Sequence, residues 1–251
     1  GDEAGTAITT ADYTTAIGYA AGLAVTTGRL NTLIGGLTGD ALTVGERNTA
    51  VGSVALGADT QGSRSVAVGN SALATQNFTS ATNAYNTAIG YDAGKSVTTG
   101  KNNTLIGGLS GDAITTASSN TAVGYSSLGA NTTGAFNTAI GYASLDANTT
   151  ANNNTAVGYD SLGANTTGTR NTGLGNSTLQ ANTTANNNTA LGYNAMALNT
   201  TGASNTAIGK DALDANTTAS NNVAVGYASL EANTTGTQNV AVGSLTLDAN
   251  T

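Results

Sequence analysis

The side chains best suited to acid–base chemistry in this 251-residue chain are its carboxylates, because it contains no His and no Cys. Without them a Ser–His relay, a thiolate nucleophile and a zinc site with the usual ligands are excluded. Asp211 and Asp214 lie close together, and two carboxylates can act as general acid and base where a cleft raises one pKa. No other part of the chain offers the same pair, so we expect solvated surface groups and no enzyme activity.

Three acidic residues could instead hold a cation. Asp214, Glu231 and Asp248 follow one another at intervals of 17 residues. If these positions stack, the like charges repel unless water or a cation such as Ca²⁺ lies between them. The glycine-rich calcium repeat is absent, so they are weak metal candidates, and we expect solvated carboxylates and no cofactor.

Aromatic residues supply the other candidate binding groups. Seven of the nine tyrosines recur at one position of a repeat, where they could stack on glycan sugars or pack between chains. Phe78 and Tyr85 lie in the segment 77–85, which interrupts that repeat and is either a recognition loop or a tolerated bulge. The residues that we predict as possible receptor contacts are Phe78, Tyr85, Tyr125, Tyr142 and Tyr159.

Charge and composition exclude two classes of partner. The formal net charge is −7, and only 7 basic residues are spread over the whole chain. Nucleic-acid binding needs clustered Lys and Arg, so we expect none. No stretch approaches the ~20 apolar residues of a membrane helix, so we expect no membrane insertion in this segment.

A 17-residue repeat positions all of these groups. Counting from Asn120 gives fourteen units between residue 14 and the end of the chain, with one insertion of four residues before Asn86. Position 3 is Ala in eleven units, position 4 is aliphatic in all, and position 5 is always Gly. We expect residues 1–13 to be a lead-in and residues 14–251 to form a single array that continues beyond the C-terminus in a longer protein.

Two positions of the repeat compensate for each other. Position 9 is Leu or Met in ten units and Gly in four. In those four units position 12, otherwise Asn, Asp or Gln, is aliphatic: Val25, Leu42, Val97 and Ile114. Such an exchange is expected where a fixed core volume must be filled, so the units must share one interior.

The repeat predicts an all-β fold, a parallel β-solenoid or β-roll of about fourteen 17-residue coils. The unit is too short for a pair of helices, and the β-branched Asn-Thr-Ala-Ile-Gly segment favours a short strand. Gly at position 5 ends that strand or permits close backbone approach. Stacked Asn side chains are expected to form hydrogen-bonded ladders between coils.

Side-chain alternation places positions 3 and 4 on opposite faces of each strand. Small Ala suits the interior of a thin coil, which leaves a continuous aliphatic stripe outside. An exposed stripe of this length favours aggregation, so we expect it to be buried in a homo-oligomer. The predicted interface residues are Ile89, Ile106, Val123, Ile140, Val157, Leu174, Leu191, Ile208, Val225 and Val242.

The NTAIGY-x-x-L unit with ANTTG between units resembles the repeat arrays of phage tail fibres and the heads of trimeric autotransporter adhesins. Ser65-Val66-Ala67-Val68-Gly69 and Asn239-Val240-Ala241-Val242-Gly243 match the adhesin core S-V-A-I-G most closely. The resemblance implies a left-handed homotrimeric β-roll on a virion tail or a bacterial surface. The period of 17 differs from the fourteen residues of the adhesin repeat.

These observations favour a structural and adhesive fibre segment that binds itself and a host cell-surface glycan or protein. The head of a bacterial adhesin that binds matrix or cells is the alternative. A third hypothesis is an ice-binding solenoid, because aligned pairs such as Thr132–Thr133 and Thr149–Thr150 could form a flat hydroxyl array. Strand propensity explains these threonines equally well.

Overall fold

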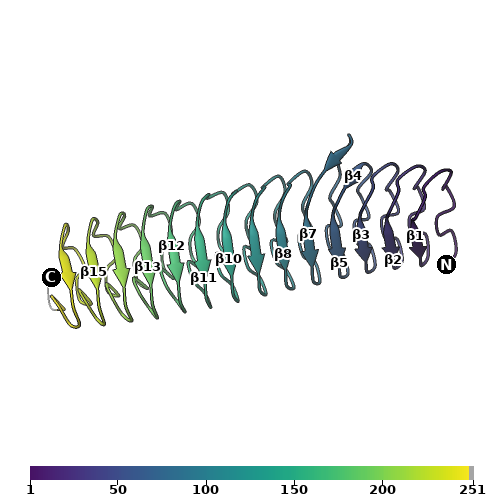
Figure 1. The fold of residues 1–251 in the computed structure, drawn as a ribbon. Coiled ribbons are helices and arrows are strands. Elements are labelled where there is room, and N and C mark those ends of the chain that lie inside the picture. The colour runs from purple at the N-terminus through teal and green to yellow at the C-terminus, as the bar shows by residue number, and fades with distance from the viewer. Residues whose placement is uncertain (249–251) are drawn as a thin grey trace. The chain divides into compact units, whose positions relative to one another are not determined.

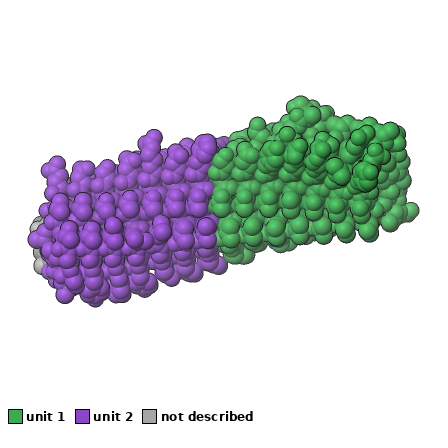
Figure 2. Space-filling model, viewed as in Figure 1, with its two compact units in different colours: residues 1–126 green, residues 127–251 purple. Residues whose placement is uncertain are grey.

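The computed structural model describes residues 1–248, which form short strands and bends. The last three residues of the predicted array, 249–251, lie outside this range. Figure 1 shows the strands in chain order, and residues 1–126 and 127–251 form two compact units, which Figure 2 colours separately. The fold is all-β and a parallel β-solenoid, as the repeat predicts, with about 13 turns where the repeat predicts about fourteen. Within residues 1–248 no helix is long and apolar enough to span a bilayer.

Each coil contributes one three-residue strand, formed by positions 2–4 of the repeat. In residues 1–126 these strands are β1 (Thr15–Ile17), β2 (Thr32–Ile34), β3 (Thr49–Val51), β5 (Val66–Val68), β7 (Thr87–Ile89), β8 (Thr104–Ile106) and β9 (Thr121–Val123). In residues 127–251 they are β10 (Thr138–Ile140), β11 (Thr155–Val157), β12 (Thr172–Leu174), β13 (Thr189–Leu191), β14 (Thr206–Ile208), β15 (Val223–Val225) and β16 (Val240–Val242).

The pairing register follows the repeat. Thr138, Ala139 and Ile140 of β10 pair in parallel with Thr155, Ala156 and Val157 of β11. Across the insertion, β5 pairs with β7 in the same register, so the extra residues leave the main sheet unchanged. They add a second, two-stranded parallel sheet between β4 (Gly62–Ser63) and β6 (Thr82–Asn83). In Figure 1 this sheet projects beside the coils of residues 1–126.

The glycine at position 5 ends each strand at a close contact between coils. Gly141 has a φ of 132°, and a Cβ there would lie 2.3 Å from the carbonyl oxygen of Gly158 in the next coil. A side chain is therefore excluded both by the backbone conformation and by the neighbouring coil. The sequence prediction of close backbone approach is confirmed.

The core is a thin layer of small and branched side chains. Ala139 at position 3 and Leu145 at position 9 are fully buried in the same coil. Where position 9 is Gly94, a Cβ would lie 2.6 Å from Leu105 Cδ1 and 3.4 Å from Val97 Cγ2. Leu105 at position 3 and Val97 at position 12 thus fill the vacated volume, and the predicted compensation is confirmed.

Buried asparagines connect the coils, as predicted. The backbone N–H of Asn154 donates to Asn137 Oδ1 at 3.0 Å, and Asn154 Nδ2 donates to the carbonyl of Gly168 at 2.8 Å. A second ladder runs through position 12, where Asn165 Nδ2 donates to Asn148 Oδ1 at 3.2 Å. These amides are buried, so each satisfied hydrogen bond also avoids the cost of an unpaired polar group.

Residues 1–13 belong to the solenoid and are not merely a lead-in. The backbone N–H of Gly5 donates to Ala21 O at 3.0 Å, and that of Thr9 donates to Thr26 O at 3.1 Å. Counting back by 17 places Gly5 at position 9 and Ile8 at position 12, the same Gly-and-aliphatic exchange as in the first two full units. The segment is a partial coil that covers the first full coil.

Candidate functional site

The strands of each unit present an aliphatic column outward. Position 3 is buried in every strand of the main sheet except β1, where Ala16 is partly exposed, so positions 2 and 4 of the same strand face away from the core. Among the predicted interface residues, Ile140 is 38% exposed, Leu191 43% and Val242 67%. Ile89 is also exposed, and the remaining six are partly exposed: Ile106, Val123, Val157, Leu174, Ile208 and Val225. The predicted outward direction of this column is confirmed.

A column of hydroxyls accompanies the aliphatic column. Position 2 is Thr in most coils and lies on the same strand face as position 4, as Thr138 and Ile140 of β10 show. The outer face of the sheet is therefore half polar, with Thr methyls and hydroxyls beside Ile and Val. The alternation of side chains along a strand predicts this column of hydroxyls, but the prediction from sequence considered only positions 3 and 4 of the repeat.

The threonine pairs of the ice-binding hypothesis do not form a fully free array. The first member of each pair bonds to the next coil: Thr149 Oγ1 donates to Thr166 O at 3.2 Å, and Thr166 Oγ1 donates to Thr183 O at 3.1 Å. These side chains are partly buried, whereas Thr150 and Thr167 are exposed. The hydroxyls of the first members are thus used to hold coils together.

The tyrosines at position 6 are about half exposed, and Tyr142, Tyr159, Tyr193 and Tyr227 contact residues of their own chain. Tyr142 and Tyr159 stack with ring centroids 5.3 Å apart and an interplanar angle of 7°. The stacking covers one face of each ring, which a sugar therefore cannot reach. Lys210 Nζ lies 5.9 Å from the ring centroid of Tyr193 and 5.2 Å from that of Tyr227. Packing within the chain thus accounts for part of the tyrosine column.

The two aromatic residues of the insertion differ in exposure. Tyr85 is 52% exposed, whereas Phe78 is only 6% exposed. The prediction that Phe78 contacts a receptor is therefore wrong for its ring, which is held inside. The carbonyl of Phe78 accepts a hydrogen bond from Thr60 Oγ1 at 2.9 Å, so Phe78 anchors the insertion and leaves Tyr85 at the surface.

A buried carboxylate fixes the base of the insertion. Asp59 is fully buried, and its Oδ1 accepts the backbone N–H of Gly62 at 2.9 Å and that of Phe78 at 3.1 Å. Gln76 Nε2 donates to Asp59 Oδ2 at 2.6 Å. Loss of hydration on burial raises the pKa of Asp59, and these hydrogen bonds partly offset that rise. Sequence reasoning missed Asp59, although it replaces Asn at position 12 in the coil before the insertion.

The candidate acids at the C-terminal end influence one another but form no metal cluster. Burial, followed by the nearby Asp211 and Glu231 charges, raises the pKa of Asp214. Asp211 forms an ion pair with Lys210. In residues 1–248 no group of three or more acidic side chains is placed to hold a metal ion, so Asp214, Glu231 and Asp248 are not brought together as ligands. No pocket is present within residues 1–248.

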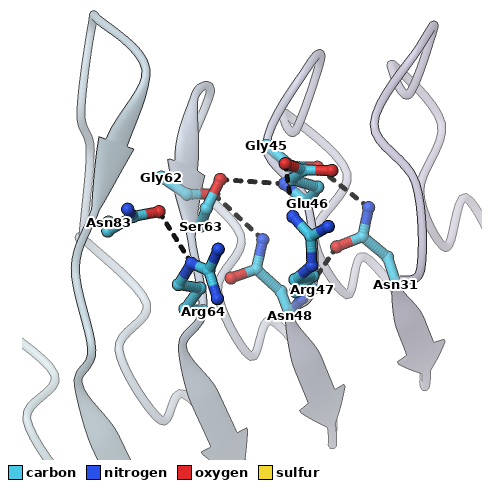
Figure 3. A network of polar contacts seen from close by, with 9 residues as sticks. All are labelled: Asn31, Gly45, Glu46, Arg47, Asn48, Gly62, Ser63, Arg64 and Asn83. Carbon is cyan, nitrogen blue, oxygen red and sulfur yellow. Dashed lines mark hydrogen bonds and ion pairs between the residues drawn. The ribbon is translucent and has the colours of Figure 1, made fainter.

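A polar network lies at the bends that precede the strands in residues 1–126 (Figure 3). Asn31 and Asn48 form its buried side, with Asn31 Nδ2 donating to Gly45 O at 2.9 Å. On the exposed side, Arg47 pairs with Glu46 at 2.5 Å, and Arg64 Nε donates to Asn83 Oδ1 of β6 at 2.9 Å. The insertion thus supplies a partner for a surface arginine.

Comparison of the chain with protein-family models, with curated proteins and with solved structures finds no match.

Proposed function

We propose that this chain is a structural and adhesive fibre segment, displayed on a virion tail or a bacterial surface as phage tail fibres are. The observation that supports it best is the bonding between successive coils. Backbone pairing, two asparagine ladders and a threonine ladder recur at 17-residue spacing. Such a stack resists bending and unfolding because every coil is held by its neighbours.

The outward aliphatic column supports self-association as part of this function. Monomeric proteins rarely expose continuous apolar patches of more than a few hundred Å². A parallel homotrimer would cover the column of each chain while leaving the bends free for adhesion. The trimer and the left-handed coil follow from the resemblance to tail fibres and adhesin heads.

Native mass measured by light scattering tests this proposal. We expect three times the 24.4 kDa of one chain. Replacing Ile140 and Val157 with Asp should reduce the mass to that of one chain, because two buried charges per chain would lack partners. The matched control replaces the exposed Thr150 and Thr167 of the same two coils with Asp, and it should keep the trimer mass.

Two outcomes would contradict the proposal. A monodisperse monomer of the unmodified chain would show that the aliphatic column needs no partner. An unchanged mass after Ile140→Asp and Val157→Asp would show that self-association uses another face. Circular dichroism of each variant confirms that the coil is still folded.

A further inference from the structure

Charges are segregated between two edges of the coil. Five of the seven basic residues occupy positions 16 and 17, which precede the strand, and ten of the fourteen acidic residues occupy positions 7 and 10, which follow it. Only Asp12 and Glu46 are acidic at the first edge. An anionic chain therefore has one edge where positive charge predominates.

Four of these basic residues lie in residues 1–126, and we call them the basic edge: Arg29, Arg47, Arg64 and Lys101. Backbone bonds align their bends in successive coils. The N–H of Arg47 donates to Arg29 O and that of Arg64 to Glu46 O, each at 3.0 Å. The insertion continues the series, since Ala84 N–H donates to Ser63 O and Asn102 N–H to Ala84 O, each at 2.9 Å.

The basic edge is exposed and only partly neutralised. Arg29 lies 3.9 Å from Asp12, a weak pair because both side chains are mostly exposed. Arg47 pairs with Glu46. Within residues 1–248 no carboxylate forms an ion pair with Arg64 or Lys101. Stacked like charges at strand spacing, about 4.8 Å per coil, repel each other, and a bound anion would relieve this repulsion.

Arg64 is held in place by neutral groups. Its Nε donates to Asn83 Oδ1 (Figure 3), and its guanidinium lies 5.7 Å from the ring centroid of the exposed Tyr85. Both contacts come from the insertion. They fix the plane of the guanidinium and leave its terminal N–H groups able to make the paired bonds that carboxylates and sulfates accept.

We propose that the basic edge binds an acidic polysaccharide, whose carboxylate or sulfate groups contact Arg47 and Arg64 in adjacent coils and Lys101 two coils further along. A row of cations along stacked bends suits a linear polymer that carries several anions, and Tyr85, in the coil between Arg64 and Lys101, adds an aromatic surface of the kind that sugars contact. Nucleic acid fits less well, because binding to a phosphate backbone needs many clustered Lys and Arg side chains and this row has only four. This inference rests on the adhesive part of the proposed function and names its ligand class.

Binding to dextran sulfate, hyaluronate and uncharged dextran of equal length tests the proposal. The full chain should bind the two anionic polymers, with affinity falling as salt rises, and should not bind uncharged dextran. The double variant Arg47→Asn, Arg64→Asn should bind at least about tenfold more weakly, because two of its charge contacts are lost. Asn already occupies position 17 in several coils, including Asn153 and Asn187, so the fold is expected to tolerate these changes.

Arg170→Asn is the matched control. Arg170 occupies position 17 with a φ of 57°, but its neighbours in that column are Asn153 and Asn187. Its loss should leave binding within about twofold, since an isolated exposed charge contributes little. Equal weakening by Arg170→Asn, absence of binding to both anionic polymers, or tighter binding to a single-stranded DNA of equal charge would overturn the proposal. Native mass measured on the same samples shows whether the oligomer is intact. A loss of polysaccharide binding can therefore be distinguished from a loss of self-association.

Discussion

At the scale of the residue, the glycine at position 5 is fixed by the coil that follows it. Gly35 has a φ of 138°, and a Cβ there would lie 2.5 Å from the carbonyl oxygen of Gly52. Gly36, its neighbour, has no atom within 4 Å of the place where its Cβ would stand. Of these two adjacent glycines, only Gly35 lies where a side chain would clash with the next coil.

We expect Gly35→Ala to lower the free energy of unfolding by about 2–3 kcal/mol, because the methyl group must displace a neighbouring backbone. Gly36→Ala is the control and should change stability by less than about 0.5 kcal/mol. Urea unfolding followed by circular dichroism measures both. Equal effects of the two substitutions would show that the coils can separate locally at little cost.

At the scale of the element, the insertion depends on one buried carboxylate. Asp59 accepts hydrogen bonds from the backbone N–H groups of Gly62, the first residue of β4, and of Phe78, which precedes β6. Its raised pKa means that the folded protein retains the proton at a pH where the unfolded chain has lost it. The resulting stabilisation is fully present below the ordinary value of 3.8 and is lost as the pH rises through the raised pKa.

We therefore expect the protein to lose stability relative to the Asp59→Asn variant as the pH rises above 3.8. The variant has no titratable group at this point, so the difference between the two unfolding free energies must change with pH. Urea unfolding at several pH values from about 3 to 7 measures this difference. A difference that does not depend on pH would contradict the role given to the Asp59 carboxylate.

The regular elements could be predicted from the sequence, whereas the insertion could not. Each column occurs up to fourteen times, so the burial of Ala at position 3, the close contact at position 5 and the asparagine ladders follow from the pattern. Phe78 and Asp59 occur once, and nothing in the repeat fixes the direction of their side chains. The stacking of Tyr142 on Tyr159 likewise depends on rotamers, which periodicity does not specify.

At the scale of the whole molecule, stability is distributed over contacts between nearest neighbours. Every described strand pair joins equivalent positions of adjacent coils. These positions are 17 residues apart in sequence, or 21 across the insertion, and the side-chain ladders also join equivalent positions of adjacent coils. In such a stack, stability is close to a sum of coil and interface terms. Length can therefore change in whole coils without loss of the fold, whereas a change of register reverses every side chain of a strand.

Deletion of two coils tests this view within residues 127–251. Removing residues 154–187, which are 34 residues, joins Asn153 to Asn188 and preserves both the register and the Gly/Ala alternation at position 15. We expect a folded protein with an unfolding midpoint close to that of the full chain.

Removing residues 154–186, one residue fewer, places Asn187 where Asn188 should stand and moves Ala190 from the core side of its strand to the outer side. That variant should unfold at lower temperature or lose part of its β signal in circular dichroism. Similar melting of the two variants would mean that the coils adapt their register freely, which the buried ladders at Asn188 and Asn205 argue against.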